Sequence, residues 1–182
     1  FRLEYWDDIG YFKDRNKMEP KFFADAHFII KEYNPESVLD AGCGMGQRVL
    51  AFSLFGVQAW GFDISTFATM ESPFPIAEKL RQGDVTKKIP FVDEFDMVMS
   101  YDLLEHLSEE QITPALQNLK ASGKKFIFSI CFENDKNYPL DLTHKTCWPR
   151  EKWEERIKSE GYKLLPVPQS LPFAHQMVVC EK

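Results

Sequence analysis

Glycines and an acidic residue gather in one short stretch, Val38 to Gly46, which reads VLDAGCGMG. An apolar run ends in Asp40, and glycines then occupy alternate positions, at Gly42, Gly44 and Gly46. Glycine lacks a Cβ, so it lets a backbone approach a ligand closely. A dinucleotide site requires G-x-G-x-x-G, but Gln47 stands in place of the third glycine, and no G-K-[ST] of a Walker loop follows. The stretch predicts a ligand-binding loop that does not serve a pyrophosphate.

Two further carboxylates follow predicted strands. Asp63 ends the apolar stretch AWGFD, and Asp84 follows Gly83 where another strand should end. A carboxylate at the first position can accept both hydroxyl hydrogens of a ribose. A carboxylate at the second position can accept from the exocyclic amine of adenine, although Gly-Asp is also common in turns. Together with Asp40, these acids suit a ligand that carries a ribose, an adenine and a positive centre but no phosphate.

Alternating strands and helices must position these residues. Helical spacing of apolar residues predicts helices over 19–33, 46–55, 65–80, 108–122 and 149–160, the third broken by Pro73 and Pro75. Strands are predicted over 37–41, 58–63, 95–101, 125–130, 162–167 and 176–180, with another before Asp84. Such alternation favours right-handed crossovers and a mostly parallel sheet, covered on both faces. The last two strands are joined by a loop too short for a crossover, so we expect them to be antiparallel.

Four sequence motifs resemble those of class I S-adenosylmethionine-dependent methyltransferases. They are VLDAGCGMG, WGFDIS, GDVTKKIPF and FDMVMSYDLLEHL, and they occur in the family's order and spacing. The resemblance covers residues 37–130 well and the C-terminal part weakly. It implies an α/β fold, a Rossmann-like three-layer sandwich with a seven-stranded sheet and an antiparallel C-terminal hairpin. We expect a single domain over residues 1–182, with 1–34 as an N-terminal helical lid segment.

The resemblance also implies S-adenosylmethionine as the cofactor and assigns its contacts. The glycine loop would surround the methionine part, Asp63 would hold the ribose, and Ile64 would pack on the adenine. Asp84 and Val85 would contact the adenine edge, and Tyr101, at the end of the fourth strand, would lie near the methyl group. The implied cofactor-binding residues are Asp40, Gly42, Cys43, Gly44, Gly46, Asp63, Ile64, Asp84, Val85 and Tyr101.

Candidate proton acceptors follow the fourth strand in YDLLEHL. His106 is the best general base, because imidazole titrates near neutral pH. Asp102 is a second candidate, whereas Glu105 is more typical of a residue that positions the next helix. A third candidate, His144, lies in a long polar loop after the fifth strand, and long loops are usually functional or mobile. The stretch THKTCWPREKWEERIKSEGY resembles the tail of many small-molecule methyltransferases, so His144 either faces the substrate or packs within this loop.

Three other functions remain open at this stage. The set Asp102, Glu105, His106 and His144 resembles the metal ligands of some metal-assisted O-methyltransferases, although aspartate replaces the first glutamate. The sequence therefore does not decide whether a metal is bound. A second alternative is a non-catalytic module that binds S-adenosylmethionine. An NAD-binding oxidoreductase is disfavoured by Gln47.

Charge and hydropathy limit the classes of partner that this chain is expected to bind. The chain has 22 Lys and Arg against 28 Asp and Glu, a net charge of −6, without a basic stripe. Nucleic acid is therefore disfavoured as a partner. No apolar run approaches the roughly 20 residues that cross a membrane. The four cysteines are widely spaced, which fits a reducing compartment and predicts a cytoplasmic protein. We expect a small-molecule or glycan-precursor acceptor, methylated on oxygen by direct in-line transfer.

Overall fold

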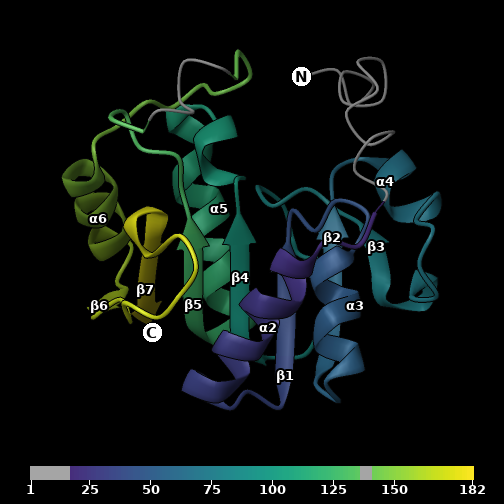
Figure 1. Cartoon of the computed structure of the whole chain (residues 1–182). Helices are drawn as coiled ribbons and strands as arrows, with labels where there is room; N and C mark the ends of the chain where they lie inside the picture. The colour runs from purple at the N-terminus through teal and green to yellow at the C-terminus, as the bar shows by residue number, and fades with distance from the viewer. Residues whose placement is uncertain (1–16, 136–140) are drawn as a thin grey trace.

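The computed structural model describes residues 17–135 and 141–182, which form a seven-stranded sheet flanked by helices (Figure 1). The strand order is β3-β2-β1-β4-β5-β7-β6. The neighbours from β3 to β5 are parallel, and β7 is antiparallel to both β5 and β6. The predicted fold class is thus confirmed. The strands are β1 Ser37–Ala41, β2 Gln58–Asp63, β3 Leu80–Gln82, β4 Phe95–Tyr101, β5 Gly123–Ser129, β6 Lys163–Leu165 and β7 Met177–Glu181.

Helices cover both faces of this sheet. The α-helices are α2 Pro20–Tyr33, α3 Gln47–Leu54, α4 Thr66–Met70, α5 Glu109–Ser122 and α6 Arg150–Ser159. Short 3₁₀ helices are η1 Ala77–Lys79, η2 Leu104–His106 and η4 Ala174–Gln176. In Figure 1, α2 and α3 lie on the near face of β1 and β4, with α5 on the opposite face. No helix in the described part of the chain is both long and apolar enough to span a bilayer.

The core divides along the sheet because successive strand residues point to opposite faces. In β1, Leu39 joins the apolar cluster that includes Ile112 and Leu116 of α5. Its neighbour Val38 joins the opposite cluster, which includes Val49 of α3. Every residue of β4 except Asp96 is buried, as expected for a central strand covered on both sides. This rigid centre fixes where the carboxyl ends of β1, β2 and β4 lie.

The helix predicted over residues 65–80 is broken near Pro73 and Pro75 as expected, but its α-helical part is much shorter than predicted. The α-helix ends at Met70, η1 covers Ala77–Lys79, and Leu80 already begins β3. Proline excludes the helical conformation from the residue before it, so Pro73 stops the helix early. The stretch from Ser72 onward instead bends back, and the Ser72 hydroxyl donates to the Met45 carbonyl at 2.7 Å.

The predicted N-terminal lid lies partly outside the described residues, because residues 1–16 are not among them. The described remainder contains α2, which packs beside α3. The lid and the single-domain organisation therefore stay predictions.

Gly46 provides a stability test of the glycine loop. Its φ is +87°, and an added Cβ would lie 2.7 Å from Ile76 Cδ1. We expect Gly46→Ala to lower the free energy of unfolding by roughly 2–4 kcal/mol, the sum of left-handed strain and overpacking. Gly56→Ala is the matched control, because φ is +83° there but nothing lies within 4 Å of the added Cβ. Urea unfolding of both variants should show the larger loss at Gly46, and equal losses would contradict the contact with Ile76.

Candidate functional site

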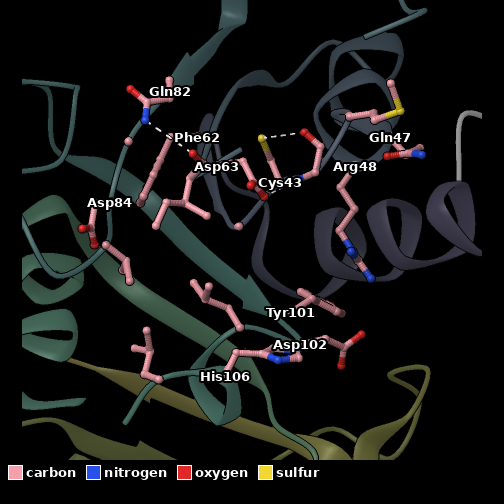
Figure 2. A pocket seen from close by; sticks show the side chains of 18 of the residues that line it. Cys43, Gln47, Arg48, Phe62, Asp63, Gln82, Asp84, Tyr101, Asp102 and His106 are labelled. Carbon is pink, nitrogen blue, oxygen red and sulfur yellow. Dashed lines mark hydrogen bonds between the residues drawn. The ribbon is translucent and has the colours of Figure 1, made fainter. Parts of the chain in front are cut away.

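A cavity of about 720 Å³ opens at the carboxyl ends of the parallel strands. Figure 2 shows side chains from the glycine loop, the ends of β2 and β4 and the η2 segment converging on it. In an open α/β sheet this is where ligands bind. Of the residues predicted from the sequence, the cavity is lined by Gly42, Cys43, Gly44, Asp63, Ile64, Asp84, Val85, Tyr101, Asp102 and His106.

The glycine loop is shaped by the chain itself as well as by its access to the cavity. Gly42 and Gly44 have φ of +77° and +53°, a region that other residues rarely adopt. The Gly42 N–H donates to the Phe62 carbonyl at 2.8 Å and thereby ties the loop to the end of β2. Gly46, in contrast, does not line the cavity but faces Ile76. Two of the three glycines thus face the ligand space, and the third allows close packing behind it.

Asp63 is fixed at the end of β2 by main-chain donors. Its Oδ2 accepts from the Gly44 N–H and its Oδ1 from the Ser65 N–H, each at 2.9 Å. These bonds hold the carboxylate beside the glycine loop, on the cavity wall. A carboxylate oxygen can accept more than one hydrogen bond, so this group retains capacity for a ligand hydroxyl. The geometry fits the predicted contact with a ribose.

Asp84 stabilises the turn that contains it. Its Oδ1 accepts from the Thr86 N–H at 2.9 Å and from the Thr86 hydroxyl at 2.7 Å, and Lys87 Nζ lies 3.3 Å from Oδ2. Burial acts to raise the pKa of Asp84, but these hydrogen bonds and Lys87 outweigh it, so its pKa falls below the ordinary value. The carboxylate nevertheless reaches the cavity wall beside Val85.

Asp40 lies behind the cavity and not on its wall. Its side chain is buried, and Oδ1 has no hydrogen-bond partner among the described residues. Burial raises the pKa of Asp40 to about 6, although Arg48 opposes this. A buried carboxylate without full compensation stabilises positive charge nearby, so Asp40 suits the positive centre of a ligand through its field.

Arg48 is a cavity residue that sequence reasoning missed. Its guanidinium carbon lies 3.6 Å from the centre of the Tyr101 ring, and Nη2 lies 3.3 Å from Oδ2 of the buried Asp25. Phe22 of α2 lies on the same wall, 5.3 Å from the guanidinium by its ring centre. A charged residue in the first turn of a helix normally indicates solvent exposure, so the sequence carries no signal for this placement.

The segment after β4 brings His106 to the cavity. Asp102 has φ of +50°, and its N–H donates to the Ser129 carbonyl at 3.1 Å. This left-handed turn leads into η2, from which His106 projects, and Figure 2 shows its ring near Asp102 and Tyr101. Burial and the neighbouring His144 lower the pKa of His106 below the ordinary histidine value. The imidazole is therefore neutral at physiological pH, as a general base must be.

His144 is not among the residues that line the cavity, so a contact between His144 and the substrate stays a prediction. Its ring packs edge-on against His106 with 4.8 Å between ring centres, and its side chain is 7% exposed. The predicted metal set also differs from the observed grouping. Candidate ligand atoms of His106, His144 and Asp141 lie within 4.8 Å of one another, without Asp102 or Glu105.

Glu105 is fully buried and ties two loops together. Its Oε1 accepts from the Cys131 N–H at 2.8 Å, and its main-chain carbonyl accepts from the N–H groups of Lys145 and Thr146. Burial raises the pKa of Glu105 to about 8, with Asp102 contributing in the same direction. The folded protein therefore holds this carboxyl protonated at neutral pH. These contacts agree with the prediction that Glu105 positions the next helix, and they favour that role over metal binding.

Glu105 should make stability depend on pH. Its folded pKa of about 8 exceeds the ordinary value of 4.5, so the folded state binds more protons than the unfolded state between these limits. The free energy of unfolding should fall by up to roughly 1.4 kcal/mol per pH unit as pH rises through this window. Glu105→Gln should remove this component, so its stability relative to wild type should improve from pH 5 to pH 8 in urea unfolding. Exposed Glu151→Gln is the control, and parallel pH curves for wild type and Glu105→Gln would contradict the assignment.

Comparisons with known proteins define the class. Residues 38–125 match the model of a family described as "Methyltransferase domain". This match over residues 38–125 confirms the prediction of a class I S-adenosylmethionine-dependent methyltransferase domain, a family whose cofactor is S-adenosylmethionine. A search of curated proteins finds no match.

Solved structures show the same fold at low sequence identity. Magnesium protoporphyrin IX methyltransferase (ChlM) from Synechocystis PCC 6803, with bound SAH, has a TM-score of 0.73 at 14% identity, covering 98% of this chain and 96% of that one. The PH0226 protein from Pyrococcus horikoshii OT3 has a TM-score of 0.76 at 15% identity, covering 98% of both chains. An S-adenosylmethionine-dependent methyltransferase from Clostridium acetobutylicum ATCC 824 has a TM-score of 0.70 at 14% identity, covering 96% of both.

Proposed function

We propose that this enzyme methylates an oxygen atom of a small-molecule or glycan-precursor acceptor, with His106 as the general base. The strongest support is that Asp63 and His106 line the same cavity. Asp63 ends β2 and His106 follows β4, and these two strands flank β1, which leads into the glycine loop. S-adenosylmethionine supplies an electrophilic methyl group on a good, neutral leaving group. The protein must then align the acceptor, exclude water and accept a proton from an acceptor hydroxyl.

We assign the cofactor's adenosine to the side of the cavity formed by Asp63, Ile64, Asp84 and Val85. Its methionine part lies at Gly42, Cys43 and Gly44, with Tyr101 near the methyl group. Asp40 and Gly46 support this loop from behind. The acceptor space is then the part of the cavity bounded by Arg48, Asp102 and His106. An imidazole suits a hydroxyl acceptor, because an amine acceptor can be used in its neutral form without a base.

The test is methyl transfer from S-adenosylmethionine labelled in its methyl group. Acceptors that differ only in presenting a hydroxyl, a carboxyl or an amine should be compared, and the product treated with mild base. In the hydroxyl and carboxyl series, a label that stays attached identifies an ether, and a label released as methanol identifies an ester. Transfer to the amine series alone would contradict O-methylation. Cofactor binding without transfer to any series would indicate the non-catalytic module.

A metal-assisted reaction is the second candidate, and the grouping of His106, His144 and Asp141 favours it. Nitrogen and oxygen ligands of this kind suit a divalent cation. Millimolar EDTA should then abolish methyl transfer while calorimetric binding of S-adenosylmethionine persists. Activity that is unchanged after EDTA treatment would leave His106 as a general base.

A further inference from the structure

Three side chains form a hydrogen-bonded chain that ends on the His106 ring. The Thr143 hydroxyl lies 2.5 Å from Asp141 Oδ1, which also accepts from the Thr143 N–H at 2.9 Å. The same hydroxyl lies 2.9 Å from His106 Nδ1. Asp141 and Thr143 belong to the loop after β5, whereas His106 belongs to η2 after β4. The chain therefore joins two loops that are distant in sequence.

The hydrogen bonds among Asp141, Thr143 and His106 determine which nitrogen of the His106 ring carries the proton. Asp141 Oδ1 accepts from both the N–H and the hydroxyl of Thr143. An aspartate carboxylate can only accept hydrogen bonds. The single hydroxyl proton of Thr143 must point to Asp141, so Nδ1 of His106 must donate to the hydroxyl oxygen. A neutral His106 then carries its proton on Nδ1 and its lone pair on Nε2.

We propose that Asp141 and Thr143 are positioning residues that hold neutral His106 in the Nδ1–H tautomer, so that Nε2 accepts the acceptor's proton. The catalytic use of this tautomer rests on the proposed function, but the tautomer itself does not. In the reaction, a bond forms between the acceptor oxygen and the methyl carbon, and the bond from that carbon to sulfur breaks. The hydroxyl proton passes to Nε2, which gives an imidazolium, a methyl ether and S-adenosylhomocysteine. Asp141 remains ionised and stabilises the imidazolium.

The surroundings of the ring restrict its orientation. The His144 ring packs edge-on against His106 at 4.8 Å. The loop that carries Thr143 is anchored just beyond it, where the N–H groups of Lys145 and Thr146 donate to the Glu105 carbonyl at 2.8 and 3.0 Å. Because Glu105 precedes His106 directly, the anchor fixes the separation between Thr143 and the ring. The Thr143 hydroxyl is therefore held in place by backbone contacts just C-terminal to it.

Long-range ¹H–¹⁵N NMR of uniformly labelled enzyme tests the tautomer directly, without an acceptor. Spectra should be recorded in millimolar EDTA, above the pKa of His106 and with His106→Gln as the assignment reference. Wild type should show a protonated Nδ1 and an unprotonated Nε2. Thr143→Val, which removes the hydroxyl with little change of shape, and Asp141→Asn should both shift the ring toward the Nε2–H form. Thr143→Ser, which retains the hydroxyl, should restore the wild-type pattern.

The chain offers a matched control in a second Asp-x-Thr turn. Asp84 Oδ1 accepts from the Thr86 N–H and hydroxyl at 2.9 and 2.7 Å, the same arrangement as in Asp141 and Thr143. Thr86→Val should leave the His106 signals unchanged. An Nε2–H pattern in wild type, or an unchanged pattern in Thr143→Val, would overturn the proposed tautomer.

Kinetics then separate the positioning role from the proposed function. Thr143→Val should lower kcat roughly 10- to 100-fold, because the base presents the wrong nitrogen, and Thr143→Ser should recover it. Affinity for S-adenosylhomocysteine should stay within about threefold of wild type. A tautomer shift with unchanged kcat would overturn the positioning role. If His106→Gln also leaves kcat unchanged, the proposed function fails while the NMR result stands.

Discussion

Replacement of Asp63 by alanine should abolish measurable binding of S-adenosylmethionine. We expect a loss of at least roughly 100-fold in affinity, because charge-assisted hydrogen bonds to two ribose hydroxyls are each worth about 1.5–3 kcal/mol. The loss has a second source, since the carboxylate also orders the loop by accepting from the Gly44 and Ser65 N–H groups. Calorimetric titration with S-adenosylmethionine and S-adenosylhomocysteine measures the effect.

Adenosine separates these two sources, because it retains the ribose but lacks the methionine part. A similar fold-loss for adenosine and for both full-length ligands would assign the effect to the ribose. The control is Asp93→Ala, since Asp93 is exposed and lies outside this cavity. Thermal melting of the ligand-free variants shows whether the fold persists. Binding by folded Asp63→Ala within threefold of wild type would remove Asp63 from the cofactor site.

Replacement of His106 by glutamine should lower kcat by roughly 10²- to 10⁴-fold, the usual contribution of a general base. The base works in its neutral form, and burial lowers the pKa of His106. The wild-type rate should therefore rise with pH through a pKa below the ordinary histidine value and be level near neutrality. His106→Gln should lose this rise. Initial rates between pH 4.5 and 8, with an acceptor found by the labelling test, measure both effects.

The control for this prediction is His27→Gln, which changes an exposed histidine on α2. Its rates should follow the wild-type pH profile. The affinity of His106→Gln for S-adenosylhomocysteine should be close to that of wild type, so that the loss resides in kcat. A full rate in His106→Gln would show that transfer needs no base from this residue and would favour an acceptor that loses its proton to water.

Local patterns were sufficient for much of the fold. Apolar runs ended by acidic residues located β1, β2 and β4 closely, and the Ser108–Gln111 pattern is a capping box at the start of α5. The break at Pro73 and Pro75 was predicted, but periodicity did not show that only a 3₁₀ turn follows it before β3 begins at Leu80. The sixteen Phe indicate a Phe-rich core but give no information on which ring packs against which partner.

The candidate site was predictable where main-chain geometry decides it and not where tertiary contacts decide it. Gly42, Gly44 and Asp63 lie at strand ends, which the topology brings together. Arg48 and its buried partner Asp25 come from two helices whose packing no sequence period encodes. The same holds for Thr143, because its contact with His106 depends on how a long loop folds back.

The Glu105 carbonyl, which receives the Lys145 and Thr146 N–H groups, has a consequence for how this enzyme can change over evolution. Glu105 also accepts from the Cys131 N–H, so insertions between Glu133 and Asp141 lie between two fixed points and need not disturb the reactive histidine. Natural variation in acceptor choice can then accumulate in that stretch while the transfer machinery stays constant. A homologue with a longer stretch would be a natural experiment in substrate range, and grafting its loop between Glu133 and Asp141 is a route to a new acceptor.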